Sequence, residues 1–176
     1  LFRSHFLNCN TVNLNKQKGV LSLEMNRGTA KNRHIFMDTY VMSKELFIDL
    51  VSKAHKTSSM YSLADIVNVA CEELDVRGVS HRGYFASITD FKSYYDANIS
   101  LIDFKMALSL FEDEWPIYTR TNDSCPTQYF EGSNVKNSIV SNGCLIEGTI
   151  ENSVIGRGCV IKKGAVVKNC VILPHV

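Results

Sequence analysis

Apolar residues follow two kinds of spacing in the first 124 residues. Residues 18–26 (KGVLSLEMN) and 34–42 (HIFMDTYVM) are rich in aliphatic and aromatic side chains, which predicts strands. Helical spacing follows in residues 44–55, where Ser43 is the expected N-cap, then in 61–74 and within 90–111, while 76–88 is predicted to be extended. This alternation of strands and helices predicts a three-layer α/β arrangement.

A different pattern begins downstream of residue 125. An aliphatic residue recurs mostly every five or six positions, and a small residue stands two positions before it. The aliphatic positions are Val140, Ile146, Ile155, Ile161, Val167 and Ile172, and the small ones are Ser138, Cys144, Ser153, Cys159, Ala165 and Cys170. The pattern predicts a parallel β-helix, in which each coil buries its side chains against its neighbours. We interpret the longer interval between Ile146 and Ile155 as a slipped coil.

The boundary between the two patterns lies in residues 123–133 (DSCPTQYFEGS), where small and polar residues gather around a proline. We therefore predict one domain over residues 1–124 and a second, the β-helix, over 125–176. The repeat runs to the final residues, LPHV, without a segment that would cap its apolar end. On this ground we expect the chain to be truncated at its carboxyl end.

Composition narrows the function classes. The 176 residues are 45% hydrophobic, which is enough for one ordinary core or two small ones. Nineteen basic residues against eighteen acidic ones give a net charge of +1, so we expect neither nucleic acid nor an anionic membrane as a partner. No apolar run is long enough to span a bilayer, and the first residues lack a signal peptide's regions, so a cytoplasmic location is expected.

The cysteines and histidines do not form a recognisable site. Six cysteines are scattered without a CxxC pair, and five histidines make no HExxH pair. We expect the three cysteines at small repeat positions to be packed in the interior, as free cysteine commonly is. The sequence GVSHRG places its second glycine one residue too late for a serine-hydrolase elbow.

Residues 82–102 (RGYFASITDFKSYYDANISLI), WPIYT and the repeat over 137–172 together resemble the carboxyl half of bacterial glucose-1-phosphate adenylyltransferase (ADP-glucose pyrophosphorylase). They are more similar still to the GlgD-type glycogen biosynthesis subunit of that family. The resemblance implies a partial nucleotidyltransferase-like domain, Rossmann-like and three-layered, followed by a left-handed β-helix of hexapeptide repeats. It also implies a tetramer, and a chain that lacks the amino-terminal half of the first domain and the last coils.

The stretch GYFASITD, residues 83–90, allows a comparison with the family's GYWxDIGT motif, whose aspartate is thought to bind magnesium. Gly83 and Tyr84 match, and Phe85 replaces the tryptophan. Ser87 stands at the position of the aspartate, and a neutral hydroxyl is a poor ligand for a hard cation. We expect a degenerate metal position at Ser87, and we expect Thr89 or Asp90 to cap the next helix.

Other departures concern the sugar-phosphate pocket. Against an ASMGIY-like strand of active relatives, Phe36 takes the serine position and Asp38 the glycine position, so the aromatic ring would occupy space that the sugar needs. The family's EKP motif has no counterpart; Lys31 could replace its lysine, although a loop lysine is usually only solvated. We therefore predict no catalytic residue and no metal, with a pocket remnant formed by Phe36, Asp38, Gly83, Tyr84 and Phe85.

The resemblance implies a modulatory, catalytically impaired subunit of glycogen biosynthesis, which assembles with an active glucose-1-phosphate adenylyltransferase as a homo- or hetero-tetramer. The partner would carry the reaction with Mg²⁺, and this chain would bind no cofactor. Two alternatives stay open. The full-length protein could be an active adenylyltransferase, or the β-helix could belong to an acyltransferase, for which His175 is the only histidine in the repeat region. Residues 116–121 are either a signalling connection or a simple linker.

Overall fold

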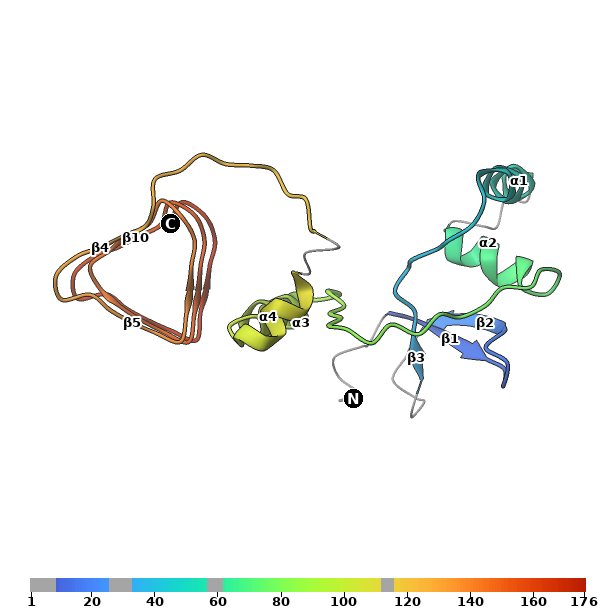
Figure 1. Cartoon of the computed structure of the whole chain (residues 1–176), viewed down its shortest axis with the longest axis horizontal. Helices are drawn as coiled ribbons and strands as arrows, with labels where there is room; N and C mark the ends of the chain where they lie inside the picture. The colour runs from blue at the N-terminus through green and yellow to red at the C-terminus, as the bar shows by residue number, and fades with distance from the viewer. Residues whose placement is uncertain (1–8, 26–32, 57–61, 112–115) are drawn as a thin grey trace. The chain divides into compact units, whose positions relative to one another are not determined.

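The structure is a computed structural model that describes residues 9–25, 33–56, 62–111 and 116–176. The chain forms two compact units, Leu1–Arg82 and Gly83–Val176, which are described separately (Figure 1). The second unit contains two helices as well as the coils, so the contacts divide the chain earlier than the boundary that we predicted at residues 124 and 125. The predicted boundary between the α/β domain and the β-helix remains a prediction, because the two compact units are defined by contacts and need not coincide with domains.

The first unit contains a small antiparallel sheet with strand order β2-β1-β3. Its strands are β1 (Asn10–Leu14), β2 (Val20–Met25) and β3 (His34–Ile35). The predicted strand over 18–26 is confirmed as β2, whereas only the first two residues of 34–42 form a strand. Strand β1 was not predicted. Its second residue, Thr11, is 3% exposed and donates its hydroxyl to the carbonyl oxygen of Glu24 at 2.9 Å, so a polar residue occupies a core position.

In the described part of the first unit, two helices accompany the sheet, α1 (Lys44–His55) and α2 (Leu63–Ala70). The Ser43 hydroxyl accepts the backbone N–H of Leu46 at 3.1 Å, which confirms it as the N-cap of α1. Helix α2 packs on β2 and α1 packs on α2. The buried positions of the two helices are Leu50, Ala54, Val67 and Ala70. The apolar residues of α1 are only partly buried, since Phe47 is 44% exposed and Val51 is 40% exposed.

The helices of the second unit are α3 (Phe91–Ser100) and α4 (Phe104–Leu110), both within the stretch predicted to be helical. Each begins after an aspartate whose side chain accepts backbone N–H groups of the first turn, Asp90 for α3 and Asp103 for α4. The cap at Asp103 explains why the stretch that we predicted to be helical divides into two helices at residues 101–103.

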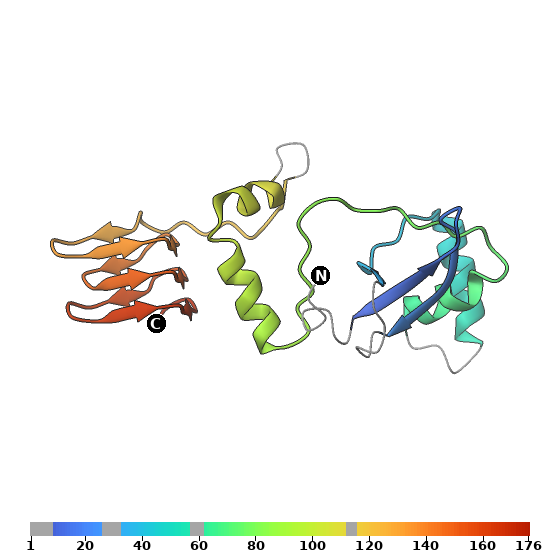
Figure 2. The ribbon, with the colours of Figure 1, turned by 90° about the horizontal axis from the view of Figure 1, so that it is seen from below.

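The carboxyl-terminal part of the second unit is a parallel β-helix, as predicted. In residues 116–176 the strands stack into three parallel sheets, ordered β10-β7-β4, β11-β8-β5 and β12-β9-β6. The end-on view shows three flat sides, and the perpendicular view shows the stacked coils (Figures 1 and 2). The strands are β4 (Gln128–Tyr129), β5 (Asn134–Lys136), β6 (Ile139–Val140), β7 (Leu145–Ile146), β8 (Thr149–Glu151), β9 (Val154–Ile155), β10 (Val160–Ile161), β11 (Val166–Lys168) and β12 (Val171–Ile172).

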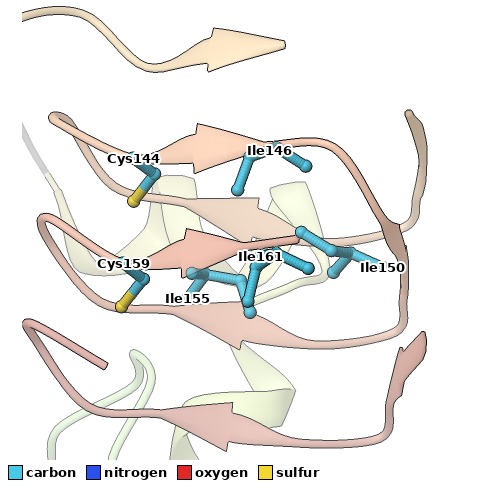
Figure 3. Packing of buried hydrophobic residues seen from close by; sticks show 6 residues of the cluster. All are labelled: Cys144, Ile146, Ile150, Ile155, Cys159 and Ile161. Carbon is cyan, nitrogen blue, oxygen red and sulfur yellow. The ribbon is translucent and has the colours of Figure 1, made fainter. Parts of the chain in front are cut away.

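The interior of the β-helix is mainly apolar. Figure 3 shows its buried cluster, with isoleucine side chains from stacked coils in contact and two cysteines above one another. The cluster consists of Cys144, Ile146, Ile150, Ile155, Cys159 and Ile161. The prediction that repeat cysteines are packed is confirmed for Cys144 and Cys159, each 0% exposed. Cys170 is half-buried.

The interpretation of a slipped coil between Ile146 and Ile155 is wrong. Ile150 occupies a full repeat position on β8, and it is aligned with Val135 on one side and Val167 on the other. The corner before it is short, because Gly148 brings the chain close to the next coil: a Cβ atom there would lie 2.5 Å from the carbonyl oxygen of Ala165. The parallel register therefore continues through this coil without interruption.

One corner of the β-helix is built from stacked asparagines. Asn137, Asn152 and Asn169 have φ values of 42°, 47° and 49°, in the left-handed region that asparagine tolerates better than most residues. The Asn137 amide donates to the Asn152 side-chain oxygen at 3.1 Å, and the Asn152 amide donates to that of Asn169 at 2.6 Å. This ladder links successive coils at one corner.

Candidate functional site

The segment Gly83–Thr89, most of the stretch that we compared with the magnesium motif of the adenylyltransferases, precedes α3. The Tyr84 and Ser87 side chains are half-buried, and Gly83 is exposed. The Tyr84 hydroxyl lies 2.9 Å from the Ser100 hydroxyl at the end of α3. Because Ser100 donates its own proton to the carbonyl oxygen of Ala97 at 2.7 Å, Tyr84 is the donor in this pair. The segment is therefore held to the far end of the helix that follows it.

Asp90 closes the segment as a helix cap. Its carboxylate accepts the backbone N–H of Ser93 at 2.7 Å, and the Ser93 hydroxyl accepts the backbone N–H of Asp90 at 3.0 Å, which completes a capping box. The backbone N–H of Ser93, followed by its hydroxyl, lowers the pKa of Asp90 below its ordinary value of 3.8. The expectation that Asp90 caps the helix is thus confirmed.

The lowered pKa of Asp90 predicts how the chain responds to acid. The cap contributes its full stability above the unfolded pKa of about 3.8 and loses it as the pH falls through the lower folded pKa. We expect Asp90→Asn to be less stable than the parent chain at pH 7, with the difference shrinking toward pH 3, in urea unfolding followed by circular dichroism. Asp123→Asn, in an exposed loop, is the control. A difference that stays constant with pH would contradict the assignment.

Phe36 and Asp38 lie in the first unit, just after β3. The backbone N–H of Phe36 donates to the carbonyl oxygen of Asn10 at 2.9 Å, and its ring meets that of Tyr40 edge-on with centroids 5.1 Å apart. Asp38 has a φ of 49°, a conformation that glycine adopts without strain. The backbone conformation thus agrees with the motif comparison, which places Asp38 at a glycine position.

Asp38 also gives its surroundings a negative charge. Its carboxylate accepts the side-chain amide of Asn10 at 3.3 Å. Burial and then the charge of Asp38 raise the pKa of the Tyr40 hydroxyl. A glycine at this position would carry no charge. The carboxylate of Asp38 would repel the phosphate group of a bound sugar phosphate.

A shallow pocket of about 600 Å³ opens between this turn and the start of α1. Its lining includes Asp38, Tyr40, Lys44 and Phe47. Of these four, Asp38 was predicted from the sequence. The other three were not, because they form no motif and are brought together only by the turn into α1. The lining contains one carboxylate, from Asp38, and one ammonium group, from Lys44, so it favours neither an anionic nor a cationic ligand.

The structure brings the predicted pocket residues into two groups. Phe36 and Asp38 belong to the first unit, and Gly83, Tyr84 and Phe85 belong to the second. That they form one pocket remnant stays a prediction, as does the degenerate metal position at Ser87. Within the described ranges, no group of three or more histidine, cysteine, aspartate or glutamate side chains is arranged to hold a metal ion. Lys31 lies outside the described residues.

His175, the histidine considered for acyl transfer, lies at a corner of the last described coil. Its φ is 63°, and its backbone N–H donates to the carbonyl oxygen of Arg157 at 2.9 Å. Its ring comes close to the previous coil, since a Cβ atom at Gly158 would lie 2.7 Å from Nδ1. The residue therefore takes a left-handed position that Gly158 fills one coil earlier.

Comparison with known proteins agrees with the coils. Residues 126–176 match the family described as GlmU-like, C-terminal hexapeptide. The chain is 34% identical to glycogen biosynthesis protein GlgD of Bacillus subtilis (strain 168) over 132 residues, which cover 75% of this chain and 38% of the relative. For GlgD of Geobacillus stearothermophilus the identity is 36%, with 78% of this chain and 40% of the relative covered. The resemblance to the glucose-1-phosphate adenylyltransferase family is confirmed.

The similarity to the adenylyltransferase family extends beyond the GlgD proteins. Glucose-1-phosphate adenylyltransferase of Fervidobacterium nodosum is 40% identical over 94 residues, which cover 53% of this chain and 23% of the relative. The match to the Bacillus GlgD is longer than either compact unit, so it includes parts of both. The chain spans about two fifths of the length of the GlgD relatives. Among the described residues, no helix has the length and apolar character needed to cross a membrane.

Proposed function

We propose that the protein acts in glycogen biosynthesis as a GlgD-type subunit, catalytically impaired, which assembles in the cytoplasm with an active glucose-1-phosphate adenylyltransferase as a tetramer. The observation that carries the proposal is the similarity to two GlgD proteins over three quarters of the chain, across both compact units. The serine at the motif's aspartate position and the charge of Asp38 in the predicted pocket support it.

The reaction of the partner would join ATP and glucose 1-phosphate into ADP-glucose and pyrophosphate with the help of Mg²⁺. Such chemistry depends on charges placed around the transferring phosphoryl group. Ser87 offers a neutral oxygen where the family motif offers a carboxylate, and Asp90, the next carboxylate, already caps α3 with a short bond to Ser93. The residues of this segment therefore do not fit a magnesium site.

The proposed contribution of this subunit is structural. The β-helix has a mainly apolar interior and presents apolar residues on its outer sides, among them Leu145 and Val160, which are 41% and 47% exposed and aligned on neighbouring strands. A partner that binds one conformation of the assembly better than another shifts the population toward it. The modulation of the active subunit would arise in this way, without chemistry at Ser87.

Restoring the carboxylate tests the impaired site. We expect Ser87→Asp in the whole protein to strengthen Mg²⁺ binding by about tenfold, because a charged oxygen replaces a neutral one, and to leave ADP-glucose formation near background, because Phe36 and Asp38 are unchanged. Calorimetric titration with Mg²⁺ and a pyrophosphate-release assay measure the two effects. Ser87→Asn, which adds similar bulk without charge, is the control. Activity restored by Ser87→Asp alone would show that the other departures are harmless.

An active enzyme is the second candidate, because glucose-1-phosphate adenylyltransferases also match the chain, with 40% identity over the 94 residues aligned to the Fervidobacterium protein. The two proposals differ in one result. Magnesium-dependent ADP-glucose formation by the isolated whole protein supports the active enzyme, and its absence supports the impaired subunit.

A further inference from the structure

Residues that precede α3 form hydrogen bonds at both ends of the helix. At its first turn, Asp90 accepts the backbone N–H of Ser93 at 2.7 Å. At its last residue, Ser100 accepts the hydroxyl of Tyr84 at 2.9 Å. The segment Gly83–Thr89 therefore contacts the end of α3 through Tyr84 and the start of α3 through Thr89. A displacement of the helix must displace the segment as well.

The middle of α3 is fastened to the β-helix. The hydroxyl of Tyr95 donates to the backbone carbonyl oxygen of Asn169 at 2.8 Å, and α3 contacts β12 just beyond this corner. Asn169 is the last step of the asparagine ladder. Its backbone N–H donates to the carbonyl oxygen of Glu151 at 3.1 Å, and its side chain accepts from Asn152 at 2.6 Å. Tyr95 thus binds a corner that is itself held by the preceding coil.

Helix α3 is not held in place by buried side chains. All of its residues are described, and none of them is buried; from Ser93 to Ser100 they are half-buried. A helix locked by buried side chains would lose little from one missing hydrogen bond, whereas a helix held by polar contacts at a partly exposed surface depends more strongly on each of them.

We propose that Tyr95 is a positioning residue: through α3 it fixes the segment Gly83–Thr89, which carries the degenerate motif, to the asparagine corner of the β-helix. A change in the packing of the coils, such as the docking of another subunit, is then transmitted to this segment by a continuous chain of contacts. The significance of the segment rests on the proposed function, but the link itself rests only on the contacts within this chain.

Hydrogen exchange at single amides tests the link. The backbone N–H groups of Thr89 and Asp90 both donate to the Ser93 hydroxyl at 3.0 Å, so their exchange reports on the junction of the segment with α3. In Tyr95→Phe we expect these two amides to exchange about two- to tenfold faster, the change that loss of one hydrogen bond allows. The amides of Ile146 and Ile155 in the coils should keep their rates.

Tyr94→Phe is the matched control, because it removes the hydroxyl of the neighbouring tyrosine in the same helix. Unchanged rates at Thr89 and Asp90 in Tyr95→Phe, or an equal rise throughout the coils, would overturn the proposal. Ser100→Ala provides an independent variant, which should loosen the segment at its other end and leave Asn169 unaffected. The exchange measurement needs no substrate and no partner, so unchanged rates would not count against the proposed function. Conversely, ADP-glucose formation by the isolated protein would not count against the link between Tyr95 and the segment Gly83–Thr89.

Discussion

Replacing Ile150 with alanine is expected to lower the free energy of unfolding of the β-helix by about 2–5 kcal/mol, the range for large-to-small changes in a close-packed core. Ile150 is 0% exposed and lies between Val135 and Val167 on the neighbouring coils. In a repeat structure each coil is stabilised mainly by its neighbours, so a cavity at this position weakens the contacts on both sides. Urea unfolding followed by circular dichroism, with hydrogen exchange to locate the effect, measures it.

Leu145→Ala is the matched control for Ile150→Ala. Leu145 lies on β7, the strand that precedes β8 along the chain, has a similar volume and is 41% exposed. Leu145→Ala should therefore lower the free energy of unfolding by well under half as much as Ile150→Ala. Amides of α1 in the first unit serve as an internal reference. If the two variants were equally stable, Ile150 would not be a core position, and the corrected register of the short coil would have to be abandoned.

Gly148→Ala is expected to destabilise the β-helix by about 3 kcal/mol or more, at the upper end of the range for overpacking. A Cβ atom at this position would lie 2.5 Å from the carbonyl oxygen of Ala165 and 2.8 Å from that of Lys162. Both are backbone atoms, so no rotation of a side chain can relieve the overlap. The Ala165 oxygen also accepts the backbone N–H of Thr149 at 2.9 Å, and its displacement would break that bond.

Gly164→Ala separates the overlap from backbone strain. Gly164 has a φ of 84°, and a Cβ atom there would have no neighbour within 4 Å, so only the strain of a left-handed alanine applies, about 1–2 kcal/mol. Thermal unfolding of the two variants should therefore show the larger loss for Gly148→Ala. The reverse order would mean that the coils can separate at this corner, and that the corner is not tightly packed.

Much of the β-helix could be predicted from its sequence, because its period forces an aliphatic residue into the interior of each coil. Ile150 was missed for a physical reason: its corner is shortened at Gly148, so it follows Ile146 after four residues in place of six. The asparagine corner was missed as well. A residue in the left-handed region leaves no periodic apolar signal, and only the spacing of Asn137, Asn152 and Asn169 could have indicated it.

The first unit was harder to predict from the sequence. Its helix cap at Ser43 was found, since the chemistry of a cap is local. Strand β1 was missed because its most buried residue, Thr11, is polar and is satisfied by a partner on β2. The strand expected over 34–42 ends early, and the left-handed conformation of Asp38 is incompatible with an extended strand continuing through it.

The candidate site illustrates a further limit. The substitution at Ser87 could be seen in the motif, and the capping role of Asp90 followed from its position before a helix. Tyr95 could not be found in this way, because its partner Asn169 lies 74 residues away and contributes a backbone oxygen, which has no sequence signature. Contacts of side chains with distant backbone atoms become visible only in the folded chain.

The most direct test of the account is an assay of ADP-glucose formation in which the whole protein is added in increasing amounts to a fixed amount of an active glucose-1-phosphate adenylyltransferase subunit from the same source. The account predicts no magnesium-dependent product from the protein alone, and a change in the partner's rate or substrate dependence that saturates as the complex forms. Product formed by the protein alone, or a partner whose kinetics are unaffected at every ratio, would contradict it.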